Sequence, residues 1–304
     1  MKGLDKLTNQ NLSVWVQEAR TQAEKGKVVE RIPLLATVKP DLLGVHICCE
    51  SGNNYSAGDI VNVFPLMSVI KPFSLLYLLE VLGAERVFQW VGVKPSNKPF
   101  NSLEQLVADD GYPRNPMINS GAITLAKKLP GENAVNSSLL FCQWLNNLAG
   151  SHLYIDEKML ACVRDSRSSA NVAIAHYLTQ SQHLNNPDLA LDIYEQICCI
   201  SGQVEDLAKL GKVLACKSGL VSCENRRLVN ALMLTCGLYE ESSEMAVKIG
   251  LPMKSGIGGG LLAIVPHQGA IACYSPALDI VGNPVAGLAL TETLAQQLQL
   301  SIFG

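Results

Sequence analysis

The strand-like segments of this sequence fall into two groups, one near each end of the chain, and this separation constrains the fold more than any other feature. Near the N-terminus, the apolar run LLGVHICC (42–49) is followed by turn residues and a second run, NYSAGD (54–59). Near the C-terminus, GGGLLAIVP (258–266) and GAIACYS (269–275) flank a two-residue turn. Short runs of this kind, bounded by Gly, Pro or Asn, predict β-hairpins. We expect the two hairpins to join in one antiparallel sheet.

The segment between the hairpins has the apolar spacing that is typical of helices. In SVIKPFSLLYLLEVL (68–82) apolar residues recur at intervals of three to four, and Pro72 is tolerated because it falls in the first turn. Residues from about 84 to 250 are mostly helical in pattern. Residues 10–26 predict an amphipathic helix, and VAGLALTETLAQQLQLSIF (285–303) predicts a closing helix.

This order of elements predicts the fold class. We expect an α/β (α+β) protein in which an antiparallel sheet is covered by the terminal helices, with a mostly helical insert beside it. The 304 residues suit one large unit. We expect a sheet subdomain at about 1–67 and 250–304, and a helical subdomain at about 68–249.

The composition excludes several classes of protein. Hydrophobic residues make up 48% and charged residues 17% of the chain, which is a globular composition. The net charge is −3 and no basic stripe is present, so nucleic acids and anionic membrane surfaces are not expected partners. No apolar run approaches the ~20 residues that span a bilayer, and the N-terminal segment does not have the apolar core of a signal peptide.

The ten cysteines do not predict a metal site. None forms a C-x-x-C pair, and the five histidines do not cluster with them. Most lie in apolar runs such as GVHICC, which is typical of reduced cysteines in a protein core. We therefore expect no metal, no cofactor and a reducing compartment, which indicates the cytoplasm.

The first candidate for catalysis is the pair Ser68 and Lys71. Residues three apart on a helix share a face, so the hydroxyl and the amine can meet. A neutral lysine can then take the serine proton as a general base. The S-x-x-K pattern alone is common by chance, and a serine at a helix start is usually a plain N-cap. Its position after the short run VFPLM, at the start of an apolar helix, favours the catalytic interpretation.

The second candidate is Lys254-Ser255-Gly256, which precedes the glycine-rich run IGGGLLAIV. A K-[ST]-G triplet lies on the strand beside the nucleophile in penicillin-recognising serine hydrolases. Glycines there let backbone N–H groups approach a ligand, as an oxyanion hole requires. The same triplet also occurs at 217–219, where no glycine-rich strand follows, so the context and not the triplet favours residue 254.

Longer motifs carry a resemblance to a known family. GKVVERIPLLA, YSAGD, SVIKP, RNPMINSGAI, GLPMKSGIGGG and SPALDIVGNPVAG occur in the order found in the glutaminase family. The resemblance extends from about residue 24 to the C-terminus. It implies a fold similar to serine β-lactamases, hydrolysis of glutamine to glutamate and ammonia, and a homo-oligomer (dimer or tetramer).

The resemblance also implies roles for individual residues. Ser68 is expected to be the nucleophile and Lys71 its base, and Tyr239 to pass a proton to the leaving ammonia. The backbone N–H groups of Ser68 and Ile257 are expected to form the oxyanion hole. By base rate alone, a tyrosine in this setting is more often a core residue than a catalyst.

Three further residues are expected to bind the substrate or line its pocket. They are Asn119 in PMIN, Asn171 in SSAN and Tyr194 in DIYEQ. Without the resemblance, the two asparagines would be as readily explained as caps or satisfied buried amides.

Two departures from the family pattern are expected around the substrate. Members of the family usually have Tyr before the Ile-Pro that here follows Arg31. They usually have Gln directly before the nucleophile, where this chain has Met67. Both changes alter the polarity of the expected pocket.

A third departure concerns the substrate ammonium group. The family has a Glu seven residues before the Asn that matches Asn171, and this Glu binds the ammonium. Counting back from Asn171 leads to Arg164, whereas counting forward from Tyr154 leads to Asp165. Asp165 would keep the negative charge and is our expected substrate-binding residue, whereas Arg164 would reverse the charge.

Three functions therefore remain in competition. The first is a metal-free glutaminase. The second is an amide hydrolase with a changed substrate, suggested by Arg31, Met67 and the choice between Arg164 and Asp165. The third is a binding protein that lost turnover, against which the retained Ser68 and the glycine-rich strand argue.

Overall fold

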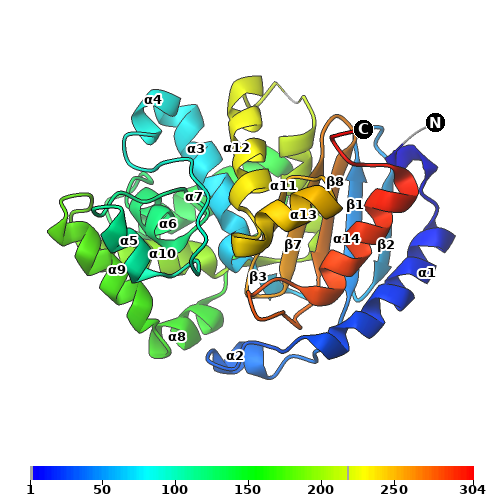
Figure 1. Cartoon of the computed structure of the whole chain (residues 1–304), viewed down its shortest axis with the longest axis horizontal. Coiled ribbons are helices and arrows are strands. Elements are labelled where there is room, and N and C mark those ends of the chain that lie inside the picture. The colour runs from blue at the N-terminus through cyan, green and yellow to red at the C-terminus, as the bar shows by residue number, and fades with distance from the viewer. Residues whose placement is uncertain (1–2, 218) are drawn as a thin grey trace.

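Residues 3–217 and 219–304 are described by a computed structural model. A five-stranded antiparallel sheet has the strand order β2-β1-β8-β7-β6 (Figure 1). Its strands are β1 (Gly44–Cys49), β2 (Asn54–Gly58), β6 (Met253–Ser255), β7 (Gly260–Val265) and β8 (Gly269–Tyr274). Strand β1 pairs with β8, so that residues from the two ends of the chain are neighbours in the sheet. The predicted antiparallel sheet of two joined hairpins is confirmed.

Alternate side chains of the strands enter two separate core clusters. In β7, Leu261 and Ala263 belong to one cluster, whereas Leu262 and Ile264 belong to the other. Successive side chains of a strand point to opposite faces, so a strand that is apolar throughout must be covered on both. The sheet is therefore the middle layer of the molecule.

Helices cover both faces. On one face lie α1 (Asn9–Arg20) and α14 (Val285–Leu298), side by side along the sheet (Figure 1). Helix α1 begins at an N-cap, Thr8, whose hydroxyl accepts a hydrogen bond from the N–H of Asn11, and a 3-10 turn, η2 (Thr21–Lys25), continues it. On the other face lies α11 (Val204–Ala215), which packs against β8, β1 and β7. The predicted cover of terminal helices is confirmed for one face.

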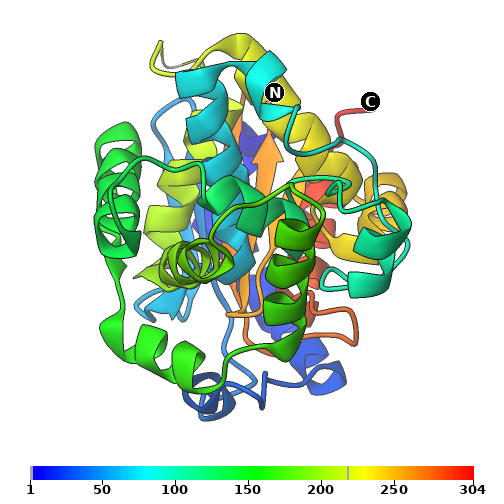
Figure 2. The same ribbon diagram turned by 90° about the vertical axis from the view of Figure 1, so that its left-hand side faces the viewer.

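The remaining helices pack beside the sheet and beyond α11. Figure 2 shows those of residues 71–198 in cyan to green, in front of the sheet, and those of residues 223–248 in yellow. The central one, α3 (Lys71–Leu82), follows a 3-10 turn, η3 (Met67–Ile70), and is nearly all apolar. The others are α4 (Ala84–Val87), α5 (Leu103–Ala108), α6 (Asn119–Ala126), α7 (Ala134–Ala149), α8 (Glu157–Asp165), α9 (Ser169–Gln180), α10 (Pro187–Cys198), α12 (Cys223–Cys236) and α13 (Ser242–Lys248). Three short pieces complete the chain: η1 (Leu4–Lys6), α2 (Pro33–Ala36) and η4 (Tyr239–Glu241).

A second, small sheet was not expected from the sequence. Its strands, β3 (Phe64–Pro65), β4 (Tyr154–Ile155) and β5 (Ile200–Gly202), pair in the order β3-β5-β4. They are too short to show a periodic pattern. This sheet ties the segment before η3 to the end of α10. Because α11 lies within 68–249 and yet packs on the large sheet, the division into two subdomains stays a prediction.

In the part of the chain that the structure describes, no helix is both long and apolar enough to cross a bilayer.

Candidate active site

Ser68 lies in a tight turn between the small sheet and α3. The N–H of Leu66 donates a hydrogen bond to the carbonyl of Ile200 (2.8 Å), which fixes the turn to β5. Met67 adopts a left-handed backbone conformation with φ of 46°, which is unfavourable for a residue with a side chain. The Ser68 side chain is thereby held at the start of the helix, largely buried but at the wall of a cavity.

Lys71, one helical turn further on, is fully buried at the start of α3. Its Nζ atom donates hydrogen bonds to the carbonyl of Met117 (3.1 Å) and to Oδ1 of Asn119 (2.7 Å). Burial lowers the pKa of Lys71 to about 8. A neutral amine has two N–H donors and one lone pair. Because both donors are used by carbonyl groups, the lone pair is left to accept a proton.

The sequence around Asn119 explains how it reaches Lys71. The side chain of Asn115 is fully buried, and its Oδ1 accepts hydrogen bonds from the backbone N–H groups of Met117 (2.9 Å) and Ile118 (3.2 Å). This turn aims the Met117 carbonyl at Lys71 and starts α6 at Asn119. Asn115 was not expected from the sequence as a site residue, although it lies in the motif NPMIN.

Asn119 also joins two other predicted residues. Its Nδ2 donates to Oδ1 of Asn171 on α9 (2.8 Å), and the Tyr194 hydroxyl on α10 donates to its Oδ1 (3.2 Å). Burial raises the pKa of Tyr194 well above its ordinary value, so the phenol stays protonated. The structure thus brings Lys71, Asn119, Asn171 and Tyr194 into one hydrogen-bond network.

The glycine-rich segment after β6 passes close to Ser68. A Cβ atom at Gly256 would lie 2.6 Å from the Leu66 carbonyl oxygen and 3.2 Å from the Ser68 nitrogen, so only glycine permits this approach. The N–H groups of Ser68 and Ile257 find no acceptor among the described residues. Two free N–H groups beside a serine are what an oxyanion hole requires.

Tyr239 and Lys254 form the remaining wall beside Ser68. Tyr239 also has a left-handed backbone, with φ of 58°, and its buried hydroxyl has no hydrogen-bond partner among the described residues. Burial raises the pKa of Tyr239 to about 12, opposed by the hydroxyls of Ser68 and Ser255, which lie near it. The Lys254 Nζ atom lies 4.3 Å from the centre of the Tyr239 ring and donates to the Ser255 carbonyl (2.7 Å). Burial, with the nearby charge of Lys71, lowers the pKa of Lys254 well below its ordinary value.

A small cavity of about 50 Å³ lies beside Ser68. Its walls include Ser68, Asn119, Asn171, Tyr194 and Ile257.

Comparison with known proteins identifies the family to which a chain with this site belongs. The sequence model described as glutaminase matches residues 26–303 of the chain. The chain belongs to the glutaminase family.

Individual relatives agree with this family assignment over nearly the whole chain. A glutaminase of Synechocystis sp. is 43% identical, with 95% of this chain and 89% of that protein covered. The crystal structure of a probable glutaminase of Bacillus subtilis superimposes with a TM-score of 0.90 at 31% identity, covering 97% of each chain. A Bacillus subtilis glutaminase in covalent complex with 5-oxo-L-norleucine, formed from 6-diazo-5-oxo-L-norleucine, superimposes with a TM-score of 0.87 at 31% identity, covering 97% and 99%.

Two of the departures from the glutaminase pattern lie at the cavity. Arg31 and Met67 both line it. Arg31 precedes α2 and is exposed. Met67 places a thioether beside the nucleophile and accepts no strong hydrogen bond.

The third departure concerns the residue expected to bind the substrate ammonium group. Neither candidate, Arg164 or Asp165, lines the cavity. Both are exposed, and Arg164 forms an ion pair with Asp192 (2.5 Å). The expected contact of Asp165 with the substrate therefore finds no support in the position of its side chain, and it stays a prediction. Val163 lines the cavity instead, and each further residue turns by about 100° around a helix, so the next two positions of α8 face outward. The carboxylate that does line the cavity, Glu195 on α10, was not expected from the sequence.

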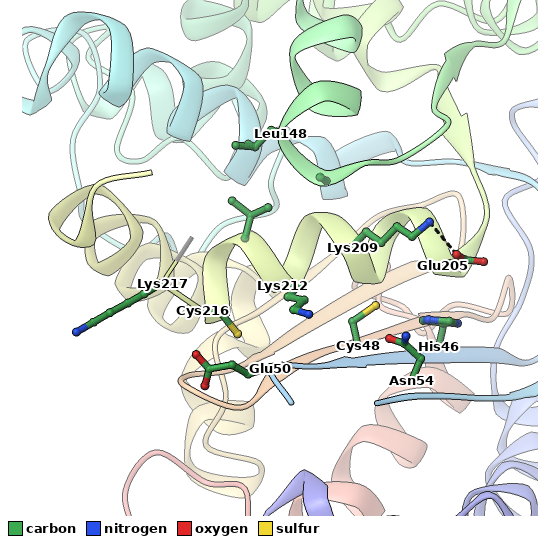
Figure 3. Close-up of a pocket in the computed structure, with 12 residues that line it drawn as sticks. His46, Cys48, Glu50, Asn54, Leu148, Glu205, Lys209, Lys212, Cys216 and Lys217 are labelled. Atoms are coloured by element: carbon green, nitrogen blue, oxygen red, sulfur yellow. Dashed lines mark ion pairs between the residues drawn. The ribbon is translucent and has the colours of Figure 1, made fainter. Parts of the chain in front are cut away.

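A larger cavity of about 430 Å³ lies elsewhere, between α11 and the β1–β2 hairpin (Figure 3). It is lined by polar side chains that include His46, Cys48 and Lys212, and by the ion pair of Lys209 with Glu205 (2.7 Å). Lys217 of the second K-S-G triplet lies at the edge of this cavity, and Figure 3 shows its side chain pointing away from the other labelled residues. Ser218 of that triplet lies outside the described residues. No group of three His, Cys, Asp or Glu side chains suited to a metal ion occurs among the described residues.

Proposed function

We propose that this chain hydrolyses L-glutamine to L-glutamate and ammonia through an acyl-enzyme on Ser68. One observation carries the mechanism most directly: Lys71 is buried, its pKa is lowered to about 8, and both N–H groups of its neutral form are used by carbonyl acceptors. Its lone pair is therefore the base available to a serine on the same face of the helix.

In the first half of the reaction, Lys71 takes the proton of the Ser68 hydroxyl as the Ser68 oxygen attacks the carbon of the substrate's carboxamide. The negative oxygen that forms lies against the N–H groups of Ser68 and Ile257. The C–N bond then breaks as the proton that Lys71 took from Ser68 passes through the Tyr239 hydroxyl to the leaving nitrogen, which departs as ammonia and leaves Lys71 neutral. The unpartnered, protonated phenol of Tyr239 supports this role.

In the second half, a water molecule attacks the Ser68 ester. Neutral Lys71 takes a proton from this water, the ester bond breaks, and the Ser68 oxygen regains its proton. The products are the free carboxylic acid, which ionises, and the unchanged enzyme. Both halves use the same base and the same oxyanion hole, so no metal ion or cofactor is needed.

Asn119, Asn171 and Tyr194 are proposed to bind the rest of the substrate, because their connected side chains form the cavity wall next to Lys71. We further propose that the protein is a cytoplasmic homo-oligomer. All ten cysteines are free, and all except Cys162 and Cys223 are buried, which suits a reducing compartment. Light scattering of the purified protein tests the oligomeric state.

The direct test of the activity is release of ammonia from glutamine, asparagine and simple amides, compared between wild type and Ser68→Ala. We expect ammonia from glutamine, dependent on Ser68. Turnover of another amide but not of glutamine would support the altered hydrolase, and binding without turnover would support the non-enzymatic protein.

A further inference from the structure

Glutamine presents two charges at its α-carbon, an ammonium and a carboxylate. A buried charge that remains unpaired costs several kcal/mol, so a pocket for this amino acid must oppose each charge with one of the other sign. In the family pattern, the anion comes from a position seven residues before Asn171. In this chain that position, Arg164, and its neighbour Asp165 both lie outside the cavity.

Glu195 is placed where such an anion is needed. Its side chain is only 5% exposed, and it lines the same cavity as Ser68 and Asn119. It follows Tyr194 directly on α10, whose hydroxyl contacts Asn119. Figure 1 shows α10 next to α6, the helix that begins at Asn119.

Arg167, in the turn between α8 and α9, holds Glu195 in place. Its Nε donates to one carboxylate oxygen (2.8 Å) and its Nη2 to the other (2.6 Å). Burial raises the pKa of Glu195, and this bidentate pairing opposes the rise. Each oxygen of a carboxylate has two acceptor sites, so one site on each remains for another donor. Arg167 itself is not among the cavity-lining residues.

Arg31 supplies the complementary charge. It lines the same cavity, and its positive charge reaches the interior, where it opposes the burial that raises the pKa values of Tyr194 and Cys198. A cation and an anion in one cavity match the two ends of a zwitterionic amino acid. They do not match a substrate with a carboxylate alone.

We propose that Glu195 is the residue that binds the α-ammonium group of the substrate, in place of the family's residue on α8. The inference rests on the proposed function, because it assigns a specificity determinant to the same site. In this assignment the anion lies on α10 rather than on α8, and Arg167 holds it in place.

The test compares kcat/KM for glutamine and for 4-carbamoylbutanoate, which is glutamine without its α-amino group. We expect wild type to favour glutamine by about 100-fold or more, as expected for a desolvated charge pair. Glu195→Gln should lose most of this preference by losing activity on glutamine and retaining it on 4-carbamoylbutanoate. The ratio of two substrates within one variant does not depend on how much of the protein is folded.

The matched control is Asp192→Asn. Asp192 lies one turn earlier on α10 and is also paired with an arginine, but outside the cavity, so this variant should keep the wild-type ratio. An unchanged ratio of kcat/KM values in Glu195→Gln, or equal use of both amides by wild type, would overturn the proposal.

If wild type releases ammonia from neither amide, the proposed activity fails. Calorimetric binding of the two amides then decides about Glu195: loss of glutamine binding alone in Glu195→Gln supports the proposal, and any other result contradicts it.

Discussion

The Nζ atom of Lys71 lies 2.7 Å from the Oδ1 atom of Asn119, and within the described structure Lys71 donates to this atom and to the Met117 carbonyl rather than to Ser68. Such an arrangement suits a base, because a neutral amine held by two acceptors keeps its lone pair for the proton of its neighbour. The expected outcomes below follow from this relationship and from the residues around it.

Replacing Ser68 with alanine should abolish turnover without unfolding the protein. Ser68 caps no helix through its side chain, so the free energy of unfolding should change by less than about 1 kcal/mol. Covalent catalysis is lost, so kcat should fall by about 10³-fold or more. Ser137→Ala, which removes a buried hydroxyl without a hydrogen-bond partner on α7, is the control and should keep full activity. More than a tenth of wild-type activity in Ser68→Ala would contradict the assignment.

The value of kcat/KM should rise with pH through a midpoint near the Lys71 pKa of about 8 and then level off. Below this pH the amine is protonated and has no lone pair, and above it the base is available. The pH dependence of kcat/KM reports groups of the free enzyme, which is the state described here. A steady rise up to about pH 10, the ordinary lysine range, would show that Lys71 is not the base.

Lys254→Met should leave the midpoint of the pH dependence of kcat/KM unchanged, although the substitution can lower kcat/KM itself. Burial and the charge of Lys71 lower the pKa of Lys254 well below its ordinary value. Burial is what lowers the pKa of Lys71, and Lys254 is not among the groups that shift it, so removing the Lys254 amine should leave the Lys71 pKa in place. A pH profile of kcat/KM for the variant checks this. A midpoint that moves upward by about one unit would mean that Lys254 carries a charge and itself holds down the pKa of Lys71.

Tyr239→Phe should separate stability from catalysis. The buried hydroxyl makes no hydrogen bond among the described residues, so its removal should leave the protein as stable as before or more stable by about 1 kcal/mol. The loss of the proton relay should lower kcat by about 10²-fold or more. Urea unfolding and ammonia release measure the two effects, with the exposed Tyr154→Phe as the control. A destabilised variant with normal kcat would assign Tyr239 to the core instead.

Gly256→Ala should damage the oxyanion hole. The new methyl group would lie 2.6 Å from the Leu66 carbonyl oxygen, so the segment carrying Ile257 must shift away from Ser68. We expect kcat to fall by about 10²-fold, the usual cost of one misplaced oxyanion donor. Gly287→Ala on α14, which packs on the far face of the sheet, should leave kcat unchanged. Equal effects of the two substitutions would argue against a special role for Gly256.

Several features followed from the sequence because they depend on neighbours along the chain. The strands at 44–49 and 260–274 were predicted from short apolar runs bounded by turn residues, and the helix from Lys71 from its periodic apolar positions. The small sheet was not predicted, since strands of two or three residues carry no period. The approach of Gly256 to Ser68 was predicted from the K-S-G triplet together with the glycine-rich run that follows it.

The sequence by itself therefore determined the main helices, the strands of the large sheet that joins the two ends of the chain, and the spacing of Ser68 and Lys71. Only the tertiary structure decided which charges face the cavity. Arg164 and Asp165 lie one and two positions after Val163, and each position turns a side chain by about 100° around the helix. Packing of α8 through its apolar side, with Met159 and Leu160 buried, fixes that rotation and turns both charges outward. Glu195 lies about 30 residues later in the chain, and only the packing of α10 against α6 and α9 brings its carboxylate to the same cavity.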